Sequence, residues 1–330
     1  MDMNKRKFQE TFNSTEYDVE NQTKIMTHQD CTFLLTLPVE LVHMIFDNLS
    51  DFTIICSFRQ VCTRLNMIMD TYPPYQKLAA IRANTPPIDY GEVQHLINAL
   101  KHNTALAKVI LSGHCIGVDG AKRFADILRI NKTIITLDLI CAEINEEGAK
   151  HLAFPLLDNT TLTTLDLSSN AIRNSGAYHL ACALRKNSTL TALFLDNAEI
   201  EKPGIAYLAG ALRNSTTLTT LDLGHNDMQD EGAQYLADAL RNNTTLTTLN
   251  LEINRIGNLG AQYLTGALQN NTRLMTLDLG LNDIRDEGVE HLIVALRENR
   301  TLTTLTLEWF YVEQNLKNRL NNLIKCNKKT

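Results

Sequence analysis

Hydrophobic residues recur along most of the chain in a pattern that repeats every 28 residues. The motif Leu-x-x-Leu-x-Leu-x-x-Asn, or a close variant, begins at Leu106, Ile134, Leu162, Leu190, Leu218, Leu246, Leu274 and Leu302. A glycine has the same period, at Gly120, Gly148, Gly176, Gly204, Gly232, Gly260 and Gly288. Self-similarity at a fixed period predicts a repeat architecture in which equivalent units stack on one another.

Each unit is predicted to contain one strand and one helix. In residues 164–167 leucines alternate with polar residues, which indicates a strand with one buried face. After the turn of another repeat, Gly148, Ala149, Leu152 and Leu156 are spaced as on one face of a helix. One unit cannot bury its own leucines, so the units must stack into a continuous core.

The ends of the expected helices carry polar residues that suit the helix dipole. Asp230 and Asp286 lie two residues before their glycines, so we predict that they are helix N-caps. Cations are favoured at the C-terminal ends of helices. The residues expected there are Arg185, Arg213, Arg241 and Arg297.

The pattern resembles the ribonuclease-inhibitor-like class of leucine-rich repeats over roughly residues 91–325. The resemblance implies an α/β fold, a right-handed solenoid with a parallel sheet on its concave side and helices on its convex side. In that class the motif asparagine satisfies backbone groups at the turn after the strand. The chain has Asn170, Asn226, Asn254 and Asn282 at this position, but also His114, Ala142, Ala198 and Phe310. We therefore expect looser turns at His114, Ala142 and Ala198.

Residues 33–76 follow a different pattern that predicts three short helices. Pro38 suits the first position of a helix, and Leu41, Ile45 and Leu49 share one helical face. A third helix is expected up to Met69, before two prolines. A domain this small is marginally stable alone, so its apolar face is expected to bind a partner.

The same segment resembles the F-box motif through Leu-Pro-x-Glu-Leu at residues 37–41, Ile45, Leu49 and Val-Cys-x-x-Leu at residues 61–65. The resemblance implies docking on the Skp-type adaptor of cullin–RING ubiquitin ligases. The residues expected at the adaptor are Leu37, Pro38, Leu41, Ile45 and Leu49. Leu65 departs from the pattern, because many F-boxes have tryptophan there. The alternative is a helical cap that only seals the first repeat.

The rest of the chain is divided by composition and pattern. Residues 1–32 are expected to be a disordered polar tail, and residues 77–90, with Pro86 and Pro87, a short linker. The solenoid is assigned to residues 91–311, opened by a helical half-repeat. Residues 312–330 are expected to be a capping helix and tail, with Leu320 and Ile324 facing the core.

Strand alternation places a mostly acidic set of side chains on the concave face. The central strand position holds Ile110, Asp138, Asp166, Phe194, Asp222, Asn250, Asp278 and Thr306, and two residues further on are Asp196, Glu252 and Glu308. Such a surface favours a basic partner. The alternative is that Leu-Asp-Leu is simply the usual filling of this repeat.

An apolar strip is expected at the C-terminal part of the rim, from Ile253, Leu281 and Trp309. Either it binds a partner, as exposed aromatic residues often do, or the last helix covers it. The predicted partner-binding residues are Asp138, Asp166, Phe194, Asp196, Asp222, Glu252, Asp278, Ile253, Leu281 and Trp309.

Composition narrows the classes of function further. The net charge of −6 argues against a protein that coats nucleic acid. We expect no membrane span and no signal peptide, and we interpret the seven cysteines as reduced thiols of a cytoplasmic protein. Lys5-Arg6-Lys7 is a weak candidate for nuclear import. The sequons at Asn159, Asn187, Asn243 and Asn299 are interpreted as by-products of the repeat.

We find no motif for catalysis or phosphate binding, so we expect a binding protein without cofactor or metal. One helix column, His151, His179, Tyr207, Tyr235, Tyr263 and His291, is expected to pack as a ladder between adjacent helices. The leading hypothesis is a substrate receptor of a cullin–RING ubiquitin ligase, monomeric outside its complex. The alternatives are a regulatory repeat scaffold without ubiquitin function and a GTPase activator that resembles the Ran activator family.

Overall fold

The structure is a computed structural model, and it describes residues 106–308 and 312–328 together with Val39, Val42, Ala80–Arg82 and Leu100. The chain divides into two compact units, Met1–Tyr72 and Pro73–Thr330. The second unit contains the repeats.

The described part of the second unit alternates strands with helices. The strands are β1 (Ala80–Arg82), β2 (Lys108–Ile110), β3 (Thr136–Asp138), β4 (Thr164–Asp166), β5 (Ala192–Phe194), β6 (Thr220–Asp222), β7 (Thr248–Asn250), β8 (Thr276–Leu279) and β9 (Thr304–Leu307). The helices are α8 (Gly117–Ile130), α9 (Glu146–Leu156), α10 (Arg173–Leu184), α11 (Lys202–Leu212), α12 (Gln229–Leu240), α13 (Asn258–Leu268), α14 (Asp286–Leu296) and α15 (Gln314–Asn327).

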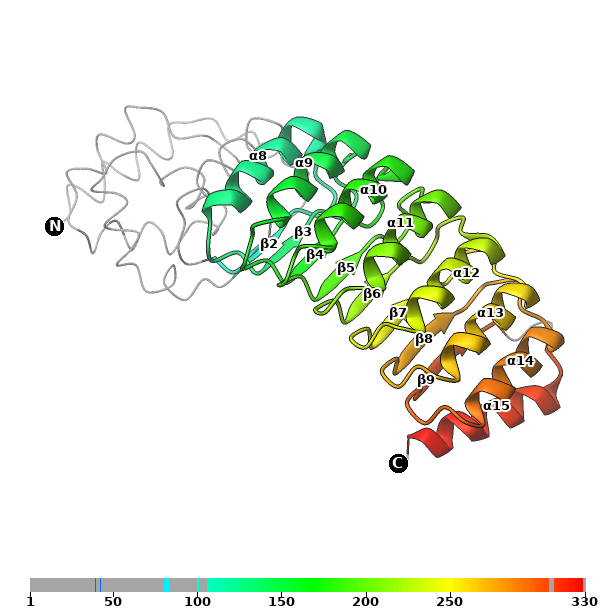
Figure 1. Ribbon diagram of the computed structural model, residues 1–330. Coiled ribbons are helices and arrows are strands. Elements are labelled where there is room, and N and C mark those ends of the chain that lie inside the picture. Colours follow the sequence, from blue (N-terminus) through cyan, green and yellow to red (C-terminus); the bar gives the residue numbers. More distant parts are fainter. Residues whose placement is uncertain are drawn as a thin grey trace, which may run out of the picture. The chain divides into compact units, whose positions relative to one another are not determined.

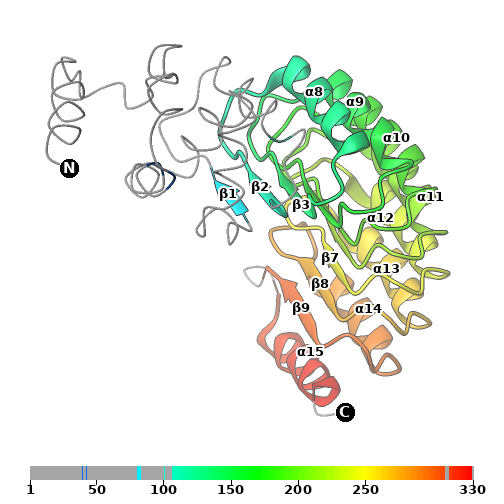
Figure 2. The ribbon, with the colours of Figure 1, turned by 90° about the vertical axis from the view of Figure 1, so that its left-hand side faces the viewer.

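The strands form one parallel sheet in the order of the sequence, β1 to β9. Each strand pairs with the next in a register of one repeat, as Leu137 does with Leu165 and Leu165 with Leu193. Within this unit the sheet lines the inner side and the helices cover the outer side (Figures 1 and 2). The predicted α/β leucine-rich-repeat solenoid is therefore confirmed. Ala80–Arg82, in the segment expected to be a linker, form a strand of this sheet.

The core runs through the whole stack of repeats. The strand leucines Leu137, Leu165, Leu193 and Leu249 are fully buried, because alternate residues of each strand face the helices. At the C-terminal end α15 packs against α14 and buries Leu316, Leu320 and Ile324. The solenoid thus ends in a closing helix with one apolar face, as predicted.

The recurring glycine allows close packing at the start of each helix. A Cβ atom on Gly148 would lie 2.8 Å from Cγ2 of Ile144 and 3.4 Å from Cβ of Ala121 in the preceding helix. Contacts of the shorter kind are essentially absent between real side chains, so a larger residue would force the isoleucine or the helix to move. The period of the glycine therefore reflects packing against the residue four positions earlier, which is an isoleucine except at Met228.

The prediction that Asp230 and Asp286 cap their own helices is wrong. Asp230 lies inside the first turn of α12, and its Oδ1 accepts from the backbone N–H groups of Gly257 and Gly260 at the start of α13. Asp286 likewise accepts from the N–H of Glu313, just before α15. These side chains cap the helix of the following repeat, because adjacent helix starts lie side by side in the stack. The expected arginines do follow the ends of α10, α11, α12 and α14.

A buried asparagine ladder runs along the turns that follow the strands. Oδ1 of Asn170 accepts from the backbone N–H groups of Ala142 and Ile144, in the preceding repeat. Asn226 does the same for Ala198. The expectation that Ala142 and Ala198 mark looser turns is therefore wrong: both are fully buried, and the asparagine of the next repeat satisfies their backbone.

A second asparagine ladder lies at the opposite turns, where each helix leads to the next strand. Nδ2 of Asn243 donates to the carbonyl of Leu212, and its Oδ1 accepts from the N–H groups of Thr245 and Leu246. Equivalent bonds are made by Asn131, Asn159, Asn187, Asn271 and Asn299. The four sequon asparagines named above, Asn159, Asn187, Asn243 and Asn299, belong to this ladder and are buried, so the folded chain does not offer these four for glycosylation.

The turns after the strands alternate between two backbone shapes. In the first shape, the first and third residues of the turn have positive φ, as at Cys141 and Glu143. In the second shape, the first and fifth residues of the turn have positive φ, as at Ser169 and Arg173. Helices start four or five residues into the turn accordingly. The alternation holds for six successive turns, from Gly113 to Arg255, and ends at Leu281.

Candidate functional site

The inner face of the sheet carries the acidic column that the sequence predicts. Strand pairing places Asp138 beside Asp166, Asp166 beside Phe194, and Phe194 beside Asp222. Asp278 follows in the same column of β8. The order of these side chains is therefore as expected, and all of them are partly exposed.

Most of the column's polar side chains hold their own turns. Each accepts a hydrogen bond from the backbone N–H two residues later, with distances of 3.0 Å for Asp166, 2.9 Å for Asp222 and 2.8 Å for Asp278. Asn250 makes the same bond at 2.9 Å with an amide oxygen. The shared bond shows that an uncharged amide oxygen can also hold the turn. This favours the alternative in which Leu-Asp-Leu is simply the usual filling of the repeat.

Burial raises the pKa of the Asp166 carboxyl, against hydrogen bonds from Ser168 that lower it, and nearby Asp138 and Asp222 raise it further. Burial likewise raises the pKa of Asp222, while the backbone of Gly224 lowers it. The negative charge of these carboxylates is therefore disfavoured in the folded chain relative to the unfolded one.

We expect Asp166→Asn to stabilise the protein at pH 7, raising Tm by roughly 1–3 °C. Because the pKa of Asp166 is raised in the folded chain, the protonated carboxyl stabilises the fold. This stabilisation is fully present below the unfolded pKa, near 3.8, and is lost as the pH rises through the folded pKa. Asparagine removes that loss and keeps the turn bond. The gain should therefore vanish below about pH 4.

Thermal unfolding of both proteins at pH 7 and pH 3 checks this. Asp283→Asn, at an exposed carboxylate of a turn, is the matched control and should change Tm at neither pH. A Tm gain for Asp166→Asn that is equal at both pH values contradicts the electrostatic cause.

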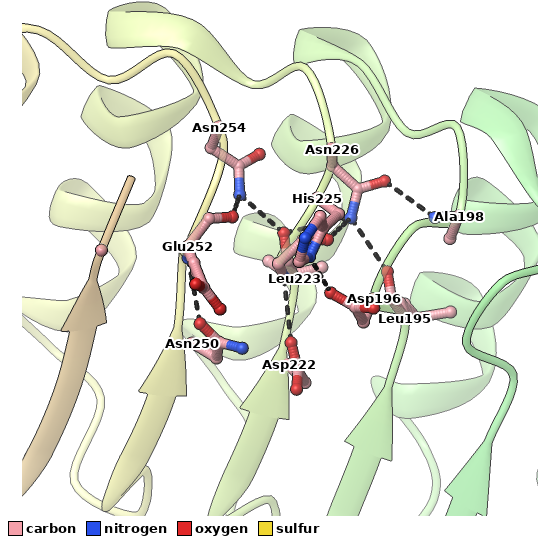
Figure 3. Close-up of polar contacts among 12 residues, drawn as sticks. Leu195, Asp196, Ala198, Asp222, Leu223, His225, Asn226, Asn250, Glu252 and Asn254 are labelled. Carbon is pink, nitrogen blue, oxygen red and sulfur yellow. Dashed lines mark hydrogen bonds and ion pairs between the residues drawn. The ribbon is translucent and has the colours of Figure 1, made fainter. Parts of the chain in front are cut away.

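A polar pair lies beside the middle of this column, where β5 and β6 lead into their turns. Nδ1 of His225 lies 2.7 Å from Oδ1 of Asp196, and both side chains are partly exposed. In the view of Figure 3 the pair is drawn below the side chain of Asn226 and above that of Asp222. Asp196 was a predicted binding residue, whereas His225 was not selected.

A cavity of about 550 Å³ opens at the rim, among the turns that follow β4 to β7. Its lining comprises Arg173, Asn174, Asn197, Glu199, Glu201, His225, Asn226, Asp227, Ile253 and Arg255. Ile253 is the only one of these that the sequence analysis selected. Most of the others do recur at the repeat spacing, as Glu199, Asp227 and Arg255 do, but the residue type changes from turn to turn, so no motif of the repeat marks them.

Ion pairs across repeats hold the cations of this cavity. Nε of Arg173 lies 2.9 Å from Glu199, and its Nη1 lies 3.3 Å from Glu146. Nη1 of Arg255 lies 3.2 Å from Asp227. The hydrogen bond from Arg173 to Glu199 and their opposite charges raise the pKa of the Arg173 guanidinium. Both arginines are thus directed toward carboxylates of other turns.

Ile253 and Leu281 begin the apolar strip predicted at the rim. The backbone N–H of Ile253 donates to the carbonyl of Gly280, which places the two turns side by side. Leu281 is 51% exposed, so α15 does not cover it, and Ile253 is partly exposed. Trp309 lies outside the described residues. The alternative in which the last helix buries the strip does not hold for Leu281.

Family models match two parts of the chain. An F-box domain model matches residues 34–77, and a leucine-rich-repeat model matches residues 158–181, 214–237, 242–264 and 270–292. The chain is an F-box protein with leucine-rich repeats. No curated protein matches it.

The five F-box residues expected at the adaptor lie outside the described residues. They are Leu37, Pro38, Leu41, Ile45 and Leu49. Within this F-box segment the structure describes Val39 and Val42, which are both helical, the first exposed and the second buried.

Two solved structures are similar to part of the chain. Leiomodin-1 actin-binding site 2 is 21% identical, with a TM-score of 0.42, over 47% of this chain and 89% of that one. The tropomodulin C-terminal domain of Caenorhabditis elegans is 17% identical, with a TM-score of 0.42, over 45% of this chain and 91% of that one. Likeness at this level carries no functional argument for this F-box protein.

The outer face of the F-box protein's repeats departs from the expected aromatic ladder. Tyr207 makes its edge-to-face contact with Tyr178, at 5.0 Å between centroids, and not with His179 of its own column. Tyr235 instead donates to Glu231 in its own helix. Among the residues that the structure describes, no three potential ligands gather as a metal site, and no helix has the length and apolarity to cross a membrane.

Proposed function

We propose that this protein is a substrate receptor of a cullin–RING ubiquitin ligase of the SCF type. The F-box segment would bind the Skp-type adaptor, and the repeats would bind a target protein. The observation that carries the proposal is the order of modules, an F-box at residues 34–77 followed by the repeat sheet. A repeat scaffold without ubiquitin function and a GTPase activator both leave the F-box unexplained.

In this role the chain makes and breaks no covalent bond. Holding a target on the repeats while the F-box is bound to the ligase raises the effective concentration of target lysines near the ligase. The partly exposed inner face and the rim of the solenoid offer the surface for that target, because successive strands present a continuous row of side chains.

A pull-down of purified Skp-type adaptor by the full chain tests the proposal. Wild type should retain the adaptor, and the double variant Leu37→Ala/Pro38→Ala should weaken binding at least tenfold, as for truncation of central interface anchors. Glu290→Gln, at an exposed position of α14, is the control and should bind as wild type does. Failure of the wild-type chain to bind the adaptor would overturn the receptor proposal.

A further inference from the structure

We infer that the rim cavity is a subsite for a lysine or arginine of the target, followed in the target by an apolar residue that rests on Ile253 and Leu281. This inference deepens the proposed function and rests on it only in taking the ligand to be a protein segment. It places recognition on the turns at the rim, beside the acidic strand column.

The size and shape of the cavity suit one long side chain. A cavity of about 550 Å³ lies toward the smaller end of the range for ligand pockets. It is open to solvent at the rim, where an extended peptide can reach it from outside. Its wall at Ile253 is apolar, and the stem of a lysine or arginine packs well on such a surface while its charged end stays among polar groups.

The charges of the lining favour a cation. Three carboxylates, from Glu199, Glu201 and Asp227, face two guanidinium groups, from Arg173 and Arg255. Both guanidinium groups already have carboxylate partners. An anionic ligand would have to compete with those partners and would also meet the remaining carboxylate.

Glu201 is the carboxylate that an entering cation can use. Its Oε2 accepts one bond, 3.2 Å long, from Nδ2 of Asn174, and its side chain is exposed at the mouth of the cavity. Within the part of the chain that the structure describes, no cation lies in ion-pair distance of it. A guanidinium or ammonium group there forms a charge-assisted hydrogen bond without displacing an existing pair.

The apolar part of the subsite stands on unfavourable backbone. Ile253 has a φ of +50° and Leu281 a φ of +51°, in a column where Asn197 has the same φ of +50°. Asparagine tolerates this region, whereas a β-branched residue there is a true outlier. Two apolar side chains on successive strained turns, one partly exposed and one exposed, are costly to the fold, and outliers of this kind cluster at binding sites.

The acidic strand column is the weaker candidate for the same contact. Asp166, Asp222 and Asp278 each use an oxygen to hold their own turn. The carboxylate of Glu201 makes no such bond at the start of its own helix. The N–H groups of Glu201 and Gly204 donate to Asn174 instead. Recognition at the rim therefore leaves the turn bonds of the column intact.

Binding of short labelled peptides to the full chain tests the inference. The probe is Gly-Ser-Arg-Leu-Ser-Gly, compared with Gly-Ser-Glu-Leu-Ser-Gly and Gly-Ser-Arg-Ser-Ser-Gly, by fluorescence anisotropy at low salt. The first peptide should bind about tenfold more tightly than the glutamate peptide and several-fold more tightly than the serine peptide. Its affinity should fall at about 0.5 M salt, where surface ion pairs are screened.

Two variants locate the site. Glu201→Gln should weaken the Arg-Leu peptide about tenfold and leave the glutamate peptide unimproved. Ile253→Asn should also weaken the Arg-Leu peptide while preserving or raising Tm, because asparagine suits this φ. Loss of affinity with a retained Tm separates a binding role from a folding role. Glu290→Gln, on the outer face, should change neither affinity nor Tm.

Equal affinity for the arginine and glutamate peptides overturns the inference, as does full affinity in both Glu201→Gln and Ile253→Asn. Tighter binding of the glutamate peptide would assign the cavity to an anion instead and overturns it too. The adaptor pull-down reports independently: a chain that binds the Arg-Leu peptide at the rim without retaining the adaptor supports the subsite and defeats the receptor proposal.

Discussion

Replacing Asn226 with alanine should lower the free energy of unfolding by about 3–5 kcal/mol. Oδ1 of Asn226 accepts from the N–H groups of Ala198 and Ile200, at 3.2 and 2.9 Å. Its Nδ2 donates to the carbonyls of Leu195, Leu223 and Gly224 at 2.8–3.0 Å. Alanine removes the side-chain partner of the buried N–H groups of Ala198 and Ile200, and each such unpaired group costs about 1–3 kcal/mol. The carbonyls of Leu223 and Gly224 keep bonds from Asn254 and from the N–H of Asn197.

Denaturant unfolding of the full chain measures this loss, and amide hydrogen exchange at Ala198 and Ile200 locates it. The matched control is Asn242→Ala, at an exposed position before β7, which should change stability by less than about 0.5 kcal/mol. A loss below about 1 kcal/mol for Asn226→Ala would show that water replaces the amide in this turn.

The second large effect separates two glycines of the same helix, α11. Gly204→Ala should destabilise the protein by about 2–3 kcal/mol, because the added Cβ would lie 2.6 Å from Cγ2 of Ile200 and 2.7 Å from Oδ1 of Asn174. That Oδ1 accepts from the N–H groups of Glu201 and Gly204 and so caps α11, which leaves it little freedom to move.

Gly210→Ala is the matched change, and it should stabilise the protein by up to about 1 kcal/mol. Its added Cβ meets only the mobile end of the Arg185 side chain, at 3.3 Å. Alanine also has the better helix propensity by about 1 kcal/mol. Denaturant unfolding of the two variants decides between this account and a general glycine requirement of α11, which would make both variants unstable by similar amounts.

The sequence was sufficient for the architecture and for the order of side chains on the inner face. A strict period of 28 residues fixes the register of every strand pair, so Asp138, Asp166 and Phe194 could be placed side by side in advance. Alternation within each strand then decided which residues faced the helices. The F-box was also recognised from its residues, although those residues lie outside the described part.

Interactions between repeats could not be predicted from local signals. Asp230 occupies a position typical of an N-cap, yet it caps the helix of the following repeat. The spacing in the sequence is the same in both cases, and only the stacking of helix starts decides which N–H groups lie within reach. The asparagines of the sequons were likewise read as incidental, because their carbonyl partners lie about one repeat away.

The rim cavity was missed for a related reason. Arg173 and Glu201 occupy the same repeat position with opposite charges, and the distances among the lining residues depend on the two backbone shapes that the turns adopt. Repeats of equal length gave no hint of two shapes. A useful signal was the change in this column from small or polar residues to the apolar Ile253 and Leu281, since a β-branched residue there opposes its backbone preference.

Because neighbouring turns differ in shape, the chain is built from pairs of repeats. Bridges join Asn145 to Ala171 and Glu201 to Asp227, each from a turn of the first shape to a turn of the second. Excision of one repeat from the middle would bring two like turns together and break this matching. Excision of two adjacent repeats would restore it, so a family of shortened or extended versions should tolerate changes of length by even numbers of repeats.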